Sequence, residues 1–178
     1  MDRLYTQPAA EATGAAARLF TAIKGAIGKV PNAYLTMGSN SPVALEMVLN
    51  LDGALRKSSL SAQDVEVIKL AVSQDAGCDY CVAAHTLMGG RAGLSAQAMR
   101  AVRSGDRSGD ARTDALAAFV HALVGSSGTV PAAVVDAVRA AGVSDAQLAD
   151  TTLAIAAITL TNLFNRINDT TLDFPAVA

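Results

Sequence analysis

The sequence has few of the residues that form charged or aromatic binding surfaces. It contains no tryptophan, three tyrosines and four phenylalanines, and only 17% of its 178 residues are charged. The basic residues are scattered and the formal net charge is −2. A surface that binds nucleic acid or an acidic membrane requires clustered positive charge. We therefore expect neither nucleic acid nor a membrane among the partners of this protein.

Export and membrane-spanning signals are also missing. The first residues, Met1 to Tyr5, lack the basic start and apolar core of a secretory signal peptide. The longest apolar stretch, Leu153 to Leu163, is interrupted by polar residues and is shorter than the roughly 20 residues that span a bilayer. The sequence therefore predicts a cytoplasmic location, where a close cysteine pair is more typical of catalysis or metal binding than of a structural disulfide.

The chain is instead rich in small and medium apolar residues. Hydrophobic residues make up 51% of it, mean hydropathy is +0.32, and alanine and valine carry most of the bias. Small side chains let helices approach closely, so this composition favours a compact helical bundle. A chain of this length buries a core without disulfide or metal staples, so we expect one domain over residues 1–178. The apolar bias also predicts a homo-oligomer.

Helical signals recur along the chain, whereas strand signals do not. Ser61 and Asp64 have the spacing of a capping box, and residues 104–110 form a polar loop. The expected helices are Ala9 to Ile27, Pro42 to Leu55, Ser61 to Asp75, a cysteine-bearing helix ending near Gly89-Gly90, a short helix after Ser95, Thr113 to Val124, Pro131 to Ala141, and Asp145 to Asn168. The fold class is therefore expected to be all-α.

Both cysteines and one of the two histidines lie between Gly77 and His85. Offsets of three and seven residues place Cys78, Cys81 and His85 on one helical face. A thiol pair with a base one turn away is the minimum apparatus for redox chemistry at sulfur. The helix N-terminus favours an acidic Cys78, at the more exposed end, whereas proximity to His85 favours an acidic Cys81. These arguments leave the choice of nucleophile open.

Glu66 is a candidate third member of this site. It lies in the apolar segment Val65 to Val72, where burial raises the pKa of a carboxylate toward the range useful for proton transfer. Antiparallel packing of the two helices would bring Glu66 to the cysteine face. The alternative is an ion pair with Lys69 on a solvated edge. The spacing alone supports both interpretations equally.

Other interpretations of these polar residues compete with the redox one. Cys78, Cys81 and His85 could ligate zinc, with Glu66 or a water as fourth ligand, or the cysteines could be buried core residues. The remaining polar residues of the apolar helices are expected to be structural: His121 as a core or interface histidine, and Asn162, Asn165 and Arg166 as capping, subunit-contact or buttressing residues.

The combined spacing resembles a known signature. Glu66, eleven intervening residues, then Cys78-x-x-Cys81-x-x-x-His85 resembles the core motif of the alkylhydroperoxidase D and carboxymuconolactone decarboxylase superfamily. The resemblance is strongest from Leu60 to Leu94, which includes "LSAQDVEVIKLAVSQDAGCDYCVAAHTLMG", and extends to the closing "NLFNRIND". It implies the all-α, single-domain helical bundle of the alkylhydroperoxidase D type, with the site between the glutamate helix and the cysteine helix.

The resemblance also implies a thiol peroxidase or disulfide reductase that needs no metal or organic cofactor. Cys81 would be the peroxidatic thiol, Cys78 would resolve it as a disulfide, and Glu66 with His85 would relay protons. A lipoyl-type or thioredoxin-like dithiol would restore the pair, and the subunits would form trimers or their multiples. Tyr80 departs from the family pattern, which often has histidine there. Decarboxylase members generally lack the cysteine pair, although a relative with another substrate could use the dithiol as a redox switch.

Overall fold

The protein is built from helices. The computed structural model describes residues 2–177, and within that range it contains helices and no strand, as expected. In chain order these are the 3-10 helix η1 (Ala9–Glu11) and α1 (Gly14–Ile27), α2 (Asn32–Asn40), α3 (Pro42–Leu55), α4 (Ala62–Asp75), α5 (Asp79–Arg91), α6 (Ala96–Ser104), α7 (Ala111–Gly125), α8 (Ala132–Ala140) and α9 (Asp145–Asn168). None of the described helices is both long and apolar enough to cross a membrane.

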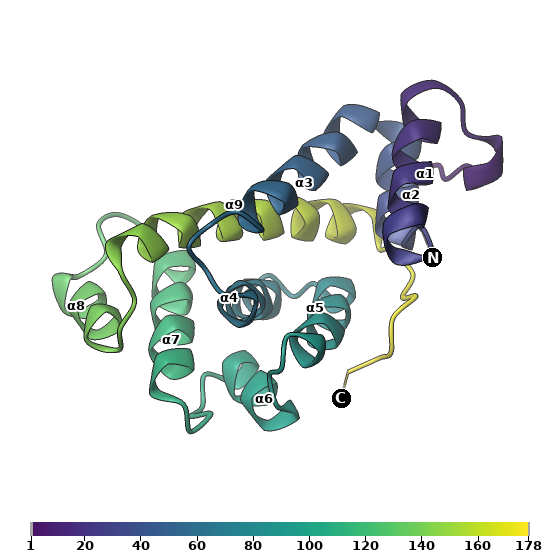
Figure 1. The fold of residues 1–178 in the computed structure, drawn as a ribbon. Helices are drawn as coiled ribbons and strands as arrows, with labels where there is room; N and C mark the ends of the chain where they lie inside the picture. The colour runs from purple at the N-terminus through teal and green to yellow at the C-terminus, as the bar shows by residue number, and fades with distance from the viewer. Residues whose placement is uncertain (1, 178) are drawn as a thin grey trace.

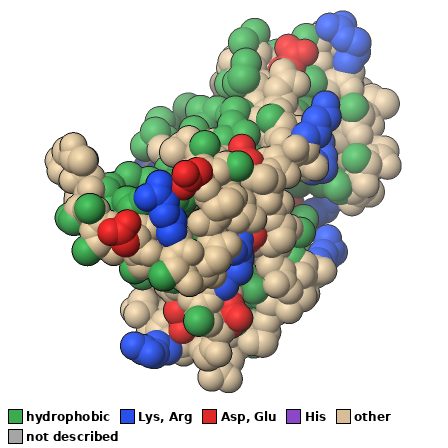
Figure 2. Space-filling model, turned by 60° about the vertical axis from the view of Figure 1, so that its left-hand side comes forward, with side chains coloured by type: hydrophobic (Ala, Val, Ile, Leu, Met, Phe, Trp, Pro, Cys, Tyr) green, Lys and Arg blue, Asp and Glu red, His purple; other side chains and the backbone are tan. Residues whose placement is uncertain are grey.

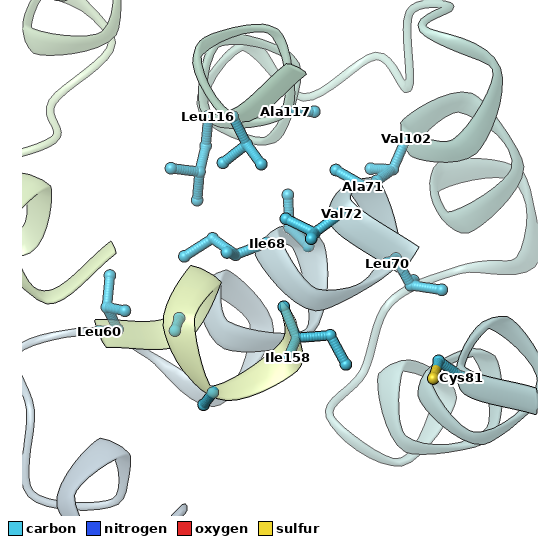
Figure 3. Close-up of a cluster of buried hydrophobic side chains, with 14 of the residues drawn as sticks. Leu60, Ile68, Leu70, Ala71, Val72, Cys81, Val102, Leu116, Ala117 and Ile158 are labelled. Carbon is cyan, nitrogen blue, oxygen red and sulfur yellow. The ribbon is translucent and has the colours of Figure 1, made fainter. Parts of the chain in front are cut away.

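Helix α4 is the centre of the arrangement. It packs against α5, α6, α7 and α9, which surround it (Figure 1). Its run Val67 to Ser73 is buried on all sides, which explains why the run is apolar apart from Lys69 and Ser73. Figure 3 shows the contacts of this core, which join Ile68, Leu70, Ala71 and Val72 of α4 with Leu116 and Ala117 of α7, Val102 of α6 and Ile158 of α9. The packing of these helices around α4 holds the cysteine-bearing α5 in place.

A second apolar cluster joins the three N-terminal helices. Its buried members include Phe20 of α1, Met37 of α2 and Leu45 of α3. The helices meet closely at Gly38, where a Cβ would lie 2.8 Å from both Phe20 Cζ and Leu45 Cδ2. Glycine is therefore required here because a larger residue would separate these helices.

Caps identified in the sequence set several helix boundaries correctly. Helix α4 begins with the expected capping box, in which Asp64 N donates to Ser61 Oγ at 3.0 Å and Ser61 N donates to Asp64 Oδ2 at 3.1 Å. Helices α3 and α9 have the expected bounds, and a loop joins α6 to α7. Local capping chemistry was sufficient at these positions.

Two features of the N-terminal helices differ from expectation. The N-terminal helix begins at Gly14 rather than Ala9, because Gly14 has a φ of 62° that breaks helical continuity. Helix α2 was not predicted: its segment is rich in turn-forming residues, and burial of Ala33 and Met37 overrides that preference. The cysteine helix ends at Arg91, near the expected Gly89-Gly90, and Gly89 serves close packing: a Cβ there would lie 2.8 Å from Met99 Sδ.

Some large apolar side chains remain on the surface. Val43 and Met47 of α3, and Leu163 and Ile167 of α9, are exposed on two helices that pack together. In the view of Figure 2, hydrophobic side chains gather in the upper part of the molecule, and charged side chains of both signs are scattered over the rest. The dispersed charge agrees with the scatter of basic residues along the sequence.

Candidate active site

A tight turn between α4 and α5 positions the two cysteines. Gly77 adopts a φ of 62°, which reverses the chain, and Cys78 N donates to Ser73 O at 3.0 Å. Cys78 is therefore the N-cap of α5, and Cys81 lies one turn inside the helix. The two are joined by a disulfide, with a Cα–Cα distance of 5.3 Å. Cys81 N also donates to Cys78 Sγ at 3.3 Å.

The disulfide is buried rather than exposed. Cys78 and Cys81 are each 2% exposed and belong to the core cluster around α4. The expectation that Cys78 occupies a more exposed end is therefore wrong, because residues of neighbouring helices cover the start of α5. A reagent reaches either sulfur only when side chains around it move.

Glu66 and His85 form a pair across the contact between α4 and α5. His85 Nδ1 lies 2.8 Å from Glu66 Oε2, and the side chains are 16% and 12% exposed. The alternative partner of Glu66 is excluded, because Lys69 is buried and its Nζ lies 2.8 Å from Asp52 Oδ1 of α3. An ionised carboxylate only accepts hydrogen bonds, so neutral His85 donates from Nδ1 and keeps Nε2 as its basic nitrogen. The pair has the form of an oriented acid–base group.

Tyr80, between the cysteines, anchors neighbouring segments. Its hydroxyl donates to Asp173 Oδ1 at 2.7 Å and accepts from Ala33 N at 3.2 Å. Its ring meets that of Phe174 edge-on at 5.4 Å, and Lys29 Nζ lies 2.8 Å from Asp173 Oδ2. Burial raises the pKa of the Tyr80 hydroxyl far above its usual value, so the group stays protonated. Tyr80 therefore joins the C-terminal segment to α2 and α5.

Helix α9 contributes a contact for which the sequence had offered buttressing of the site only as one alternative to a capping or subunit-contact role. Asn165 Nδ2 donates to Cys81 Sγ at 3.3 Å. Asn162 lies one turn earlier and bonds only to α4, accepting from Ser73 Oγ at 3.2 Å and donating to Val72 O at 3.5 Å. Asparagine is unfavourable in a helix interior, so its recurrence at 162, 165 and 168 was the signal that could have identified a buried polar face.

His121 lies outside this group and is structurally satisfied. Its Nδ1 lies 2.7 Å from Asp75 Oδ2 and its Nε2 lies 2.9 Å from Val102 O. The sequence had shown no acid at useful spacing, because Asp75 comes from α4, far along the chain. Among residues 2–177, no group of three or more histidine, cysteine or acidic side chains is arranged to hold a metal ion.

Comparison with known proteins finds a family match for the middle of the chain. Residues 42–123 match the carboxymuconolactone decarboxylase family model. A protein of unknown function from Agrobacterium tumefaciens, provisionally described as the antioxidant defence protein AhpD, is 25% identical; the match covers 80% of this chain and 99% of that one, with a TM-score of 0.70. Among curated protein sequences, none matches at a significant level.

Two more distant structures share the fold. An uncharacterised peroxidase-related protein with an alkylhydroperoxidase AhpD core, from Ralstonia eutropha, is 20% identical, with a TM-score of 0.81 and coverage of 97% of this chain and 92% of that one. The debrominase Bmp8 is 18% identical, with a TM-score of 0.75 and coverage of 96% and 92%. At these identities the likeness establishes the fold alone, and the fold is that of AhpD-like proteins.

Proposed function

We propose that this protein is a thiol-dependent oxidoreductase that reduces hydroperoxides or disulfides, on the premise that residues 42–123 match the carboxymuconolactone decarboxylase family model. The observation that carries the proposal is the Cys78–Cys81 disulfide at the start of α5, the helix that also bears His85, which pairs with Glu66 of α4. A thiol pair beside an oriented base is the equipment that such a reaction needs. Sulfur carries the electrons, so the reaction requires neither a metal nor an organic cofactor.

The proposed reaction has two steps at sulfur. The Cys81 thiolate attacks the outer oxygen of a hydroperoxide, which breaks the O–O bond, releases an alcohol and leaves a sulfenic acid. Cys78 then attacks the Cys81 sulfur, which forms the disulfide and releases water. One hydroperoxide and two thiols thus give one alcohol, one water and one disulfide. The electrons lost by the two sulfurs are those that reduce the peroxide.

Glu66 and His85 move the protons in this scheme. Neutral His85 takes the thiol proton on Nε2, and Glu66 stabilises the resulting imidazolium through Nδ1–H. His85 returns the proton to the leaving alkoxide. The hydrogen bond of 2.8 Å between His85 and Glu66 supports these roles because it fixes both the tautomer and the ring orientation.

A second dithiol must restore the reduced cysteines. Thiolate attack on one sulfur gives a mixed disulfide, and the second thiol of the partner displaces the protein cysteine. We propose a lipoyl-type or thioredoxin-like dithiol as this partner. A disulfide substrate would be reduced by the same exchange in the opposite direction.

The direct test replaces Cys81 with serine and measures hydroperoxide consumption with a dithiol reductant. The proposal predicts that Cys81→Ser loses turnover, since a hydroxyl does not form the sulfenic acid. In the wild type, peroxide should remove two titratable thiols and the reductant should restore both. Undiminished turnover by a folded Cys81→Ser protein would overturn the proposal, as would wild-type thiols that peroxide leaves unchanged.

A further inference from the structure

Asn165 has no role in the proton relay, yet its side chain touches a reacting atom. Its Nδ2 donates to Cys81 Sγ at 3.3 Å from the neighbouring helix α9, and its side chain is buried. The sulfur of Cys78 has a different kind of donor: Cys78 Sγ accepts a hydrogen bond from the backbone N–H of Cys81 at the start of α5. Within residues 2–177 each sulfur thus has one hydrogen-bond donor, and of these two donors only the one to Cys81 is a side chain that mutation can remove.

The orientation of the Asn165 amide depends on a chain of groups that begins at the backbone. Arg3 N and Leu4 N donate to Asn168 Oδ1 at 3.2 and 2.9 Å. Backbone N–H groups are unambiguous donors, so this atom of Asn168 must be the oxygen. The Nδ2 of Asn168 therefore faces Thr170 and donates to its Oγ1 at 3.0 Å.

Thr170 in turn fixes the orientation of the Asn165 amide. Its hydroxyl accepts from Asn168 and donates to Asn165 Oδ1 at 2.8 Å, which leaves the Asn165 amide nitrogen toward the sulfur. Reversing the Asn165 amide would bring its oxygen against Cys81 and leave the Thr170 proton without an acceptor. Thr170 reaches back to α9 because Asp169 adopts a left-handed conformation, with a φ of 54°.

We propose that Asn165 is a catalytic residue that stabilises the thiolate of Cys81, and that Thr170 is the positioning residue that keeps its amide nitrogen on the sulfur. The inference rests on the proposed thiol chemistry and deepens it, because it gives a physical reason for Cys81 to be the reacting thiolate. A hydrogen bond to an ionised acceptor is about twice as strong as one to a neutral acceptor. The donor therefore acts most strongly when the disulfide is open and Cys81 is charged.

The hydrogen bond from Asn165 also determines which of the two sulfurs the partner dithiol attacks in the reduction step. When a thiolate of the partner attacks Cys78 Sγ, a new disulfide forms to Cys78 and the Cys78–Cys81 bond breaks. The electron pair of that bond remains on Cys81, which leaves as the thiolate that Asn165 faces. A sulfur that leaves as a stabilised thiolate leaves faster, so Asn165 favours attack at Cys78.

The test measures the acidity of Cys81 without any peroxide. A Cys78→Ser background leaves Cys81 as the single thiol, and serine is itself a favourable N-cap for α5. Thiolate formation is followed by ultraviolet absorbance across a pH titration, which needs no reagent to enter the core. In this background Asn165→Ala should raise the apparent pKa of Cys81 by about one unit, a tenfold loss in the acid dissociation constant.

Asn162→Ala is the matched control. Asn162 is equally buried on the same helix and bonds to Ser73 and Val72 rather than to sulfur, so its loss should leave the Cys81 titration unchanged. Thr170→Val keeps the shape of Thr170 and removes its hydroxyl, so it should raise the Cys81 pKa by a smaller amount. Thr170→Ser restores the hydroxyl and should restore the wild-type titration.

These outcomes separate the inference from the function on which it rests. An unchanged Cys81 pKa in folded Asn165→Ala, or an equal shift in Asn162→Ala, would overturn the role of Asn165. Thr170→Ser behaving like Thr170→Val would overturn the positioning role of Thr170. A shift confined to Asn165 and Thr170 in a protein that consumes no peroxide would support the inference and reject the hydroperoxide as substrate.

Discussion

Helix α4 makes two kinds of contact with its neighbours, and the comparison separates support from chemistry. Toward α7 it presents Asp64, which pairs with Arg112 at 3.1 Å, and Asp75, which pairs with His121 at 2.7 Å. Toward α5 it presents Glu66, whose partner is His85 at 2.8 Å. All three pairs join an acid of α4 to a nitrogen base on a neighbouring helix at nearly the same distance.

The pairs differ in how many further partners their members hold. Arg112 also donates to Gly142 O at 2.7 Å, and Ser61 N adds a hydrogen bond to the Asp64 carboxylate. Although burial opposes ionisation of Asp64, the hydrogen bonds that Arg112 and Ser61 donate to its carboxylate hold its pKa below the usual range. On the α5 side, the hydrogen bonds found within residues 2–177 engage only one ring nitrogen of His85. A pair with a free nitrogen can exchange protons, whereas fully bonded pairs hold helices together.

The largest expected effect is a difference between His85 and His121 variants in the rate of peroxide-driven disulfide formation. His85→Leu removes the base, so it should slow peroxide-driven disulfide formation by about 100-fold, the lower range for general acid–base catalysis. His121→Leu should change that rate by no more than about twofold, because it leaves the reacting groups in place. The measurement is the rate of loss of the two thiols after mixing reduced protein with hydroperoxide. Equal slowing by both variants would contradict the distinction between the pairs.

The second prediction concerns stability, for which the same two variants should rank in the opposite order. His121→Leu leaves the Val102 carbonyl without its partner and should lower the free energy of unfolding by about 1–2 kcal/mol. His85→Leu should cost less, because it loses one hydrogen bond rather than two. Urea unfolding of the oxidised proteins measures both. If His85→Leu were the less stable variant, His85 would belong with the supporting pairs.

The sequence allowed one part of the site to be predicted and not the other, for a physical reason. Cys78, Cys81 and His85 lie on one helix, so periodicity alone placed them together, and the apolar segment around Glu66, together with the family signature, made Glu66 a candidate. Cys81 and Asn165, by contrast, are 84 residues apart, and Tyr80 and Asp173 are 93 residues apart. No spacing rule connects positions on separate helices. Such contacts depend on how α9 and the C-terminal segment pack against α5.

The fold shows the same division between local and long-range information. Capping residues correctly located the starts of α4 and α9, because a cap acts on its own first turn. Helix α2 was missed because its stability comes from packing against α1 and α3 rather than from its own residues. Helical sequence signals therefore sufficed for the fold class, but not for this helix or for the buried asparagines.

The smallest expected effect concerns Tyr80. It lies between the two cysteines in the chain, but its hydroxyl is fully hydrogen-bonded, as are the Asp64–Arg112 and Asp75–His121 pairs. Its hydroxyl already has both a donor and an acceptor, and its pKa is raised by burial, so it has no proton to exchange near neutral pH. Tyr80→Phe should therefore change the rate of disulfide formation by no more than about twofold. It should lower the free energy of unfolding by about 1 kcal/mol, because Ala33 N loses its acceptor. A rate loss approaching that of His85→Leu would show that proximity to the sulfurs, rather than an unoccupied hydrogen-bonding position, determines which residues take part in the chemistry.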